Sequence, residues 1–277
     1  MRPVIVEALN SYFQTEIFAW LVPNTKIIYT IAFVLVMAIF VNRSSKIGLS
    51  KTYAFWSGIW AIVFGMLGLK MYHLLSNFNN LVKNPAIIFA DVPEAISWVG
   101  YIAGIGGFLL FLRLNRAPIL RYLDALCSTL GLGVFVVRWN CFLYGCCFGL
   151  PSSLPWAISF PKGSPAYNAH LLRGYITPEA KISLPVHPFQ IYLSLNGLFL
   201  FVLTSLFWQK LRYKPGMTFC LFWLSYCITT FYLEFFRDTI RHKLSIGSLS
   251  SSQIISTLLI PLFTIGLWQW WKVKYKQ

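Results

Sequence analysis

Four ionisable residues in this sequence stand at the ends of long apolar stretches, namely Arg138, His187, Arg237 and Arg241. Ionisable groups are costly in hydrocarbon, so those found at membrane depth are candidates for a functional role. A guanidinium group stays charged in any surroundings and binds phosphate through two parallel hydrogen bonds. A histidine can take up a proton near neutral pH. Together these groups would suit the headgroup of an anionic phospholipid.

Each of these residues also has a structural explanation. An arginine at the end of a span often only extends its charge into interfacial water. We expect this of Arg241, whereas we expect Arg138 to be functional because apolar residues flank it. His187 is either part of this headgroup site or a residue that fixes a hinge beside the following proline. Glu234 precedes Arg237 by three residues, so the two share a helix face and form either a structural ion pair or part of a catalytic set.

The composition indicates what kind of protein carries these groups. The chain has 277 residues, of which 57% are hydrophobic and only 11% are charged. Those proportions are typical of a polytopic membrane protein and exclude a soluble domain with an ordinary core. A membrane helix needs roughly 20 mainly apolar residues. We therefore predict an all-α protein with about seven transmembrane helices, at residues 27–42, 53–75, 97–113, 122–142, 188–208, 216–236 and 253–271.

Basic residues follow alternate predicted spans and so indicate the orientation of the chain. Loops rich in Lys and Arg stay in the cytoplasm, which predicts an N-terminus outside and a C-terminus inside. The net charge of +15 then reflects topology and anionic lipid headgroups, and we expect no nucleic-acid partner. The basic clusters are Arg43, Lys46 and Lys51; Arg113, Arg116 and Arg121; Lys210, Arg212 and Lys214; and Lys272, Lys274 and Lys276.

The connecting segments complete the predicted architecture, a single transmembrane domain over residues 1–277. Segments of about 76–96 and 148–187 are long, and the second is rich in Pro, Ser and Gly, so we expect them to form an extracytoplasmic cap. Residues 4–23 are apolar but contain two glutamates, which favours an interfacial segment over a cleaved signal peptide.

Six cysteines are spread along the chain, and four of them lie in or near apolar spans, where a small buried hydrophobic residue is the ordinary role. Cys146 and Cys147 are adjacent, which is not the Cys-x-x-Cys spacing of zinc-binding proteins. Because no second Cys or His pair stands at such a spacing, we predict neither a metal site nor a cofactor. The adjacent pair could instead line a cavity or form a redox pair with Cys141.

Short strings along nearly the whole chain form an ordered set. In chain order they are Tyr29; a Gly-rich span with Gly104, Gly106 and Gly107; Arg138, Phe142, Gly145 and Gly149; Pro155-Trp156-Ala157 with Phe160-Pro161; His187-Pro188 with Gln190 and Tyr192; Glu234-Phe235-Phe236-Arg237; and Gln253. The set resembles the R-x-G-N-F-x-N-G-E, H-P-x-Q-x-Y-E and E-F-F-R motifs, and the spans around them, of the prolipoprotein diacylglyceryl transferase family. Packing alone would explain the glycines, because small residues let helices approach closely.

The resemblance implies a seven-helix enzyme of the bacterial cytoplasmic membrane. Such an enzyme moves the diacylglyceryl group of phosphatidylglycerol to the cysteine thiol of a lipoprotein precursor at the outer leaflet, and glycerol phosphate leaves. The reaction implies that His187, Arg138 and Tyr101 are catalytic, with Arg138 on the phosphate and either His187 or Tyr101 as the base. Tyr101 stands where the family has a histidine, and His187 is better suited to take up a proton near neutral pH. The expected substrate-binding residues are Arg237, Gln190, Tyr192, Glu234 and Tyr29.

The sequence also departs from the family motifs. Cys141, Tyr144 and Cys146 stand where the signature has Asn, Asn and Glu, and Leu193 replaces the last Glu of H-P-x-Q-x-Y-E. The loss of these polar groups favours, as an alternative, a related transferase that uses the same anionic donor with a lipid, glycan or other membrane acceptor. A non-catalytic lipid-binding membrane protein is a third hypothesis.

Overall fold

The computed structural model describes residues 25–78, 97–211, 214–238 and 249–272. Within these ranges the regular elements are helices, and pairing of extended backbone is confined to isolated bridges. Six helices are long and apolar enough to cross a membrane, and Val99–Leu114 forms a shorter apolar helix. The predicted all-α polytopic membrane protein is therefore confirmed. The helices are α3 Thr25–Lys46, α4 Lys51–Ser76, α6 Ser97–Leu114, α7 Ile119–Tyr144, α8 Pro165–Leu172, α9 Phe189–Leu211, α10 Met217–Leu233 with the 3-10 turn η3 Glu234–Phe236, and α11 Ser251–Lys272.

The chain divides into two compact units, one of residues 37–123 and one of residues 1–36 and 124–277. The single domain expected from the sequence stays a prediction. The segment at 4–23 and nearly all of the expected cap segment at 76–96 lie outside the described residues.

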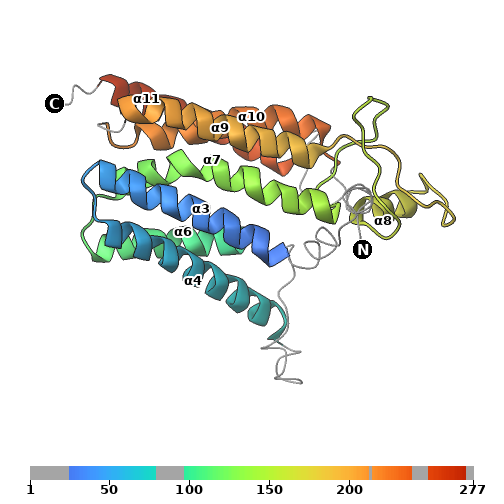
Figure 1. The fold of residues 1–277 in the computed structure, drawn as a ribbon, viewed down its shortest axis with the longest axis horizontal. Helices are drawn as coiled ribbons and strands as arrows, with labels where there is room; N and C mark the ends of the chain where they lie inside the picture. The colour runs from blue at the N-terminus through green and yellow to red at the C-terminus, as the bar shows by residue number, and fades with distance from the viewer. Residues whose placement is uncertain (1–24, 79–96, 212–213, 239–248, 273–277) are drawn as a thin grey trace, which may run out of the picture. The chain divides into compact units, whose positions relative to one another are not determined.

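In the smaller unit, α4 and α6 lie side by side and pack through glycines (Figure 1). A Cβ atom on Gly104 would lie 2.8 Å from the carbonyl oxygen of Ala61, and one on Gly107 would lie 2.8 Å from that of Trp60. Only a residue without a side chain allows this approach, so close packing explains these glycines. Gly106 is different, because a Cβ atom there would meet nothing within 4 Å.

In the larger unit, α7 and α9 are antiparallel and also cross at glycines. A Cβ atom on Gly131 would lie 2.5 Å from the carbonyl oxygen of Gly197, and one on Gly197 would lie 2.6 Å from the amide nitrogen of Phe135. Toward the other end of the pair, the Thr204 hydroxyl lies 3.3 Å from the Ser128 carbonyl. The C-terminal end of α7 therefore lies beside the N-terminal end of α9.

Helix α10 packs against both α9 and α11, as Figure 1 shows. The amide of Gln253, near the start of α11, donates to the carbonyl of Phe231, near the end of α10. At the start of α10, the buried carboxylate of Asp124 accepts from the backbone N–H groups of Gly216 and Phe219, at 2.6 and 2.7 Å. Asp124, on α7, thus caps the start of α10.

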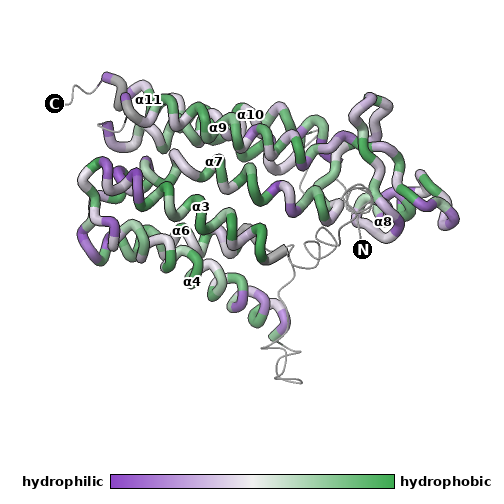
Figure 2. The backbone as a smooth tube through the Cα atoms, in the orientation of Figure 1, coloured by the Kyte–Doolittle hydropathy of each residue, from purple (hydrophilic) through white to green (hydrophobic). Residues whose placement is uncertain are grey.

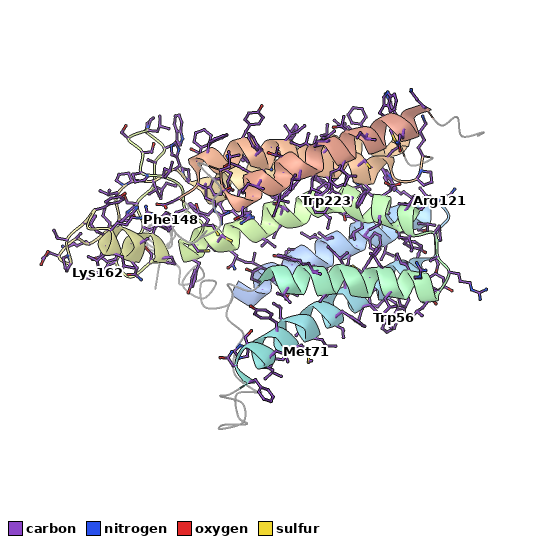
Figure 3. All side chains as sticks on the ribbon, turned by 180° about the vertical axis from the view of Figure 1, so that it is seen from behind. Trp56, Met71, Arg121, Phe148, Lys162 and Trp223 are labelled. Carbon is purple, nitrogen blue, oxygen red and sulfur yellow. The ribbon has the colours of Figure 1, made fainter. Side chains whose placement is uncertain are left out.

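Hydrophobic residues follow the helices, whereas hydrophilic residues gather in the connections (Figure 2). Residues 145–187 fold around a small core to which Phe142, near the end of α7, also contributes. In this segment the short helix α8 begins with Ser164 as N-cap and Pro165 in its first turn. The core side chains are Phe142, Phe148, Phe160, Ala166 and Val186. Figure 3 labels Phe148 beside α8 and Lys162 further out in the same segment. Residues 145–187, which we call the cap, thus have an ordered structure of their own.

Candidate functional site

Three segments that are distant in the sequence meet where α7, α9 and α10 join the cap. Residues 148–151 lie between residues 185–187, which precede α9, and residues 236–238, which follow α10. Backbone hydrogen bonds join them: Gly149 N–H to His187 C=O at 3.0 Å, His187 N–H to Leu150 C=O at 3.0 Å, Leu150 N–H to Phe236 C=O at 2.9 Å, and Asp238 N–H to Phe148 C=O at 3.2 Å. We call this arrangement the ladder.

Gly149 stands at the centre of the ladder. A Cβ atom there would lie 2.6 Å from the Cβ of His187 and 2.7 Å from the carbonyl oxygens of both His187 and Phe236. Real side chains do not approach so closely, so this position needs glycine. The consequence is that His187 and Arg237 are held on opposite sides of one residue, since Arg237 pairs with Gly149 in an isolated bridge.

The Arg237 side chain is fixed by two neighbours. Its Nη1 donates to Glu234 Oε1 at 3.2 Å, and the guanidinium carbon lies 5.8 Å from the ring centre of Phe189. The Glu234 side chain is only 3% exposed and the Arg237 side chain 21%. An arginine held in this way keeps several N–H donors for an anionic ligand.

His187 belongs to a chain of polar side chains across the surface of the cap. The indole N–H of Trp156 donates to the Tyr192 hydroxyl at 2.8 Å, and that hydroxyl lies 3.2 Å from His187 Nδ1. The His187 ring also packs edge-on against Phe236, with ring centres 5.2 Å apart. These contacts fix the orientation of the imidazole and leave its Nε2 as the atom that could exchange a proton.

The end of α7 makes the turn that leads into the ladder. Gly145 adopts a left-handed conformation with φ +73°, its N–H donates to Phe142 C=O at 3.2 Å, and Cys146 N–H donates to Cys141 C=O at 3.1 Å. This pair of bonds is the Schellman motif that commonly ends a helix at glycine. The fully buried amide of Gln190 then donates to the Cys146 carbonyl at 2.6 Å, which anchors the turn to α9.

The turn gathers three thiols and two positive charges. The sulfur atoms of Cys141, Cys146 and Cys147 all lie within 4.8 Å of one another. The pKa of the Cys147 thiol is lowered, chiefly because the thiols of Cys141 and Cys146 donate to its sulfur; burial opposes this effect, and the positive charges of Arg237 and Arg138 add to it. Arg138 precedes Cys141 by three residues on α7, and Arg237 pairs with Gly149, two residues after Cys147.

Comparison with known proteins shows which family this chain belongs to. The sequence pattern of the family described as prolipoprotein diacylglyceryl transferase matches residues 25–271, which is nearly the whole chain. The chain belongs to the prolipoprotein diacylglyceryl transferase family. It is therefore a transferase of the diacylglyceryl transferase type and a multi-pass membrane protein, and the non-catalytic hypothesis is set aside.

Individual members of the prolipoprotein diacylglyceryl transferase family align over most of their length. The phosphatidylglycerol–prolipoprotein diacylglyceryl transferase of Clostridium tetani is 30% identical over 231 residues, which cover 82% of this chain and 85% of that protein. The second such enzyme of Clostridium perfringens is 27% identical and covers 80% of each chain. The Brucella anthropi enzyme is 30% identical over 79% of this chain and 72% of its own.

The structure brings most of the predicted site residues of this family member together. Arg138, His187, Arg237, Glu234, Gln190 and Tyr192 all lie in the larger unit at the cap end of their helices or in the ladder. Tyr29 lies on α3 in the same unit, and its side chain is half exposed. Tyr101 lies on α6 in the smaller unit and is 70% exposed. Arg241 lies outside the described residues.

Sequence reasoning anticipated Cys141 beside the adjacent cysteines only as one alternative, a redox pair. The glycine four residues after Cys141 and directly before the adjacent cysteines, the pattern of a Schellman turn, favours that proximity. Sequence reasoning missed a bidentate ion pair in which Arg173, just after α8, holds the Asp238 carboxylate at 2.8 and 2.7 Å. The two residues are 65 positions apart, so no local sequence pattern predicts their contact.

Proposed function

We propose that this protein transfers the diacylglyceryl group of phosphatidylglycerol to the cysteine thiol of a lipoprotein precursor at the outer leaflet of a bacterial cytoplasmic membrane. The donor and acceptor are those named for the clostridial and Brucella relatives. The observation that carries the proposal is the placement of His187 and of Arg237, which is paired with the buried Glu234, on either side of Gly149 in the ladder.

Two cations suit the leaving group of this reaction. As the glyceryl C–O bond breaks, glycerol phosphate gains negative charge, and preorganised cationic donors stabilise such charge best where water is excluded. In the proposed mechanism Arg138 and Arg237 bind the phosphate oxygens, and Glu234 holds Arg237 in position. Glu234 is thus a positioning residue rather than the base.

His187 is the proposed base for the acceptor thiol. Only the thiolate attacks carbon well, so the thiol must lose its proton. In the tautomer whose Nδ1–H donates a hydrogen bond to the Tyr192 hydroxyl, the lone pair of His187 Nε2 can accept the proton of the acceptor thiol. Tyr192 and Trp156 then orient the imidazole, as a second residue orients the base in other nucleophilic sites.

The remaining predicted residues receive supporting roles in the proposal. Gln190 holds the Cys146 carbonyl and so keeps the turn after α7 in place, while its own buried Oε1 has no partner among the described protein groups. Tyr29 stays a predicted substrate contact. Tyr101 stays a predicted alternative to His187 as the base.

The proposed orientation has the N-terminus outside and the C-terminus in the cytoplasm. Its support is the distribution of basic residues, such as Arg113, Arg116 and Arg121 in and around the loop between α6 and α7. The cap and the ladder would then face the outside. Lys274, Lys276 and Arg212, which contribute to the same argument, lie outside the described residues.

Transfer can be measured directly with the purified protein in phosphatidylglycerol vesicles. A synthetic peptide with the cysteine of a lipoprotein precursor should gain the mass of a diacylglyceryl group, and glycerol phosphate should appear in equal amount. The same peptide with serine in place of cysteine is the control. Consumption of phosphatidylglycerol without modification of the peptide would contradict the proposed acceptor and favour a lipid or glycan acceptor. No consumption of the lipid would contradict the donor.

A further inference from the structure

The thiol cluster has the composition of a site for a soft metal ion. Cys141, Cys146 and Cys147 are half-buried free cysteines, and their sulfurs lie within 4.8 Å of one another. A zinc–sulfur bond is about 2.3 Å long, so three sulfurs around one tetrahedral ion lie about 3.8 Å apart. Small rotations of the side chains reach that spacing from the observed one.

The backbone is arranged to produce this cluster. The Schellman bond from Cys146 N–H to Cys141 C=O folds the chain back over the end of α7. Cys147 then adopts a left-handed conformation, with φ 52°, which a residue with a side chain seldom adopts. Such strain persists where surrounding structure enforces it, and it is concentrated at functional sites. Here the ladder and Gln190 enforce it on both sides of the turn.

We propose that Cys141, Cys146 and Cys147 bind one zinc ion as three thiolates and leave its fourth position open for the thiol of the acceptor. Within the described ranges no fourth His, Cys, Asp or Glu joins the cluster. A structural zinc site has four protein ligands, whereas three protein ligands with one open position are typical of a catalytic site. Thiolates select soft ions such as zinc over magnesium or calcium.

This inference rests on the proposed function, because it assigns a second group to activation of the same thiol. A thiol that coordinates a metal loses its proton outright. The acceptor's S–H proton would pass to His187. The sulfur lone pair then forms the C–S bond to the glyceryl carbon, and the C–O bond breaks with its electron pair leaving on the phosphate oxygen. The ion remains zinc(II) throughout, so neither an oxidant nor a reductant takes part.

The charges around the cluster fit such an ion. Three thiolates and one zinc ion carry a net charge of −1, and a bound acceptor thiolate makes it −2. Arg138 precedes Cys141 by three residues on the same helix, and Arg237 pairs with Gly149, two residues after Cys147, so both cations would offset this charge. The same two guanidinium groups bind the phosphate in the proposed function, so the attacking sulfur and the departing phosphate would be held side by side.

Metal content tests the site without reference to activity. The purified full chain, kept reduced and dialysed against trace zinc, should contain one zinc ion per chain by elemental analysis. Cys146→Ser and Cys147→Ser should each lose it, whereas Cys227→Ala, which removes a buried thiol on α10, should keep it. Because a serine variant could fail to fold, zinc should also leave the wild-type protein with a chelator and return on re-addition. Wild-type protein without zinc, variants that keep it, or a disulfide between two of the three thiols would overturn the proposal.

The open position has its own test. Cobalt(II) in place of zinc gives a visible spectrum that reports its ligands, so the cysteine peptide should change that spectrum and the serine peptide should not. An unchanged spectrum with saturating cysteine peptide would overturn the open position.

The activity measurement separates this proposal from the proposed function. A free thiol of pKa about 8.5 is only about 3% thiolate at pH 7, so chelation should slow transfer about thirtyfold there and less as the pH rises. Transfer at the wild-type rate after chelation would overturn the metal's role and leave the proposed function intact. Zinc binding without any transfer of the diacylglyceryl group would instead refute the proposed function.

Discussion

Gly149 and His187 approach so closely that a Cβ atom on the glycine would lie 2.6 Å from the Cβ of the histidine. Gly149→Ala should therefore push the ladder apart and displace His187 from Arg237. A displacement of about 1 Å at a site of this kind lowers the rate about a hundredfold. Gly106→Ala is the matched control, because a Cβ atom there meets nothing within 4 Å. Transfer rates at equal expression check this, and equal rates in both variants would refute it.

Arg138 is expected to stabilise the leaving phosphate. Arg138→Ala should lower the rate about a hundredfold, or about 3 kcal/mol, as loss of one strong transition-state contact does. The transfer rate of Arg138→Lys should also be well below that of the wild type, because lysine keeps the charge but cannot form two parallel hydrogen bonds to the phosphate. Arg121→Ala, at the opposite end of α7 and exposed, should be close to wild type. If Arg138→Gln works normally, the residue is only a membrane anchor.

Glu234 and Arg237 should behave as a coupled pair, since their side chains lie 3.2 Å apart and the carboxylate is buried. In a double-mutant cycle with Glu234→Ala and Arg237→Ala, the double variant should be less impaired than the sum of the single effects. The expected coupling is about 1 kcal/mol, typical of residues in contact. The rates of transfer measure it. Additive losses would mean that Glu234 acts on the substrate independently of Arg237.

The Arg173–Asp238 pair should hold the cap to the end of α10. The Asp238 side chain is only 1% exposed, so Arg173→Ala leaves a buried charge without its partner. Because the Arg173 side chain is 28% exposed, we expect a loss of about 2 kcal/mol, below the range for fully buried pairs. Faster protease cleavage within residues 150–187 would report it. The Lys181→Ala variant, which changes an exposed residue of the cap, should be cleaved by the protease at the wild-type rate.

The stability of the cap should depend on pH through His170. Burial lowers the pKa of this histidine from its ordinary 6.5, and the charge of Asp238 only partly opposes the effect. Below pH 6.5 the unfolded chain therefore binds a proton that the folded cap does not, so stability is full above that pH and falls below it.

Thermal unfolding at about pH 5 and about pH 7.5 checks the His170 prediction. His170→Gln can still accept from Leu184 N–H, which donates to His170 Nδ1 at 3.2 Å, and it should unfold with a smaller pH dependence. An identical pH dependence in wild type and variant would exclude His170 as the cause.

The helices could be predicted from the sequence because each one is an apolar run of membrane length. The span predicted at 122–142 corresponds to α7 at Ile119–Tyr144, and that predicted at 188–208 to α9 at Phe189–Leu211. Site residues could be predicted from the sequence where they stand close together in one motif at the end of a helix, as Glu234 and Arg237 do. Their 3.2 Å contact follows from a spacing of three residues on one helical turn.

The other contacts could not be predicted, because they depend on how the chain folds and not on a recognisable spacing of residues. Asp124 accepts a hydrogen bond from the backbone N–H of Gly216, 92 positions later, so no local pattern predicts that it caps α10. The prediction against a metal site rested on the spacing of zinc-binding motifs. The helix end after residue 141 folds back and brings residues 141, 146 and 147 together without such a motif, and the metal content of the protein tests the prediction.

The ladder also constrains how the protein is made. Its central segment, residues 148–151, leaves the ribosome before both of its neighbours, and the last neighbour, residues 236–238, follows only after α10. The chain thus carries an unpaired central segment through the synthesis of two further spans. A chain in which either span fails to insert can never close the ladder, so misinserted copies would remain inactive and leave the membrane lipids intact.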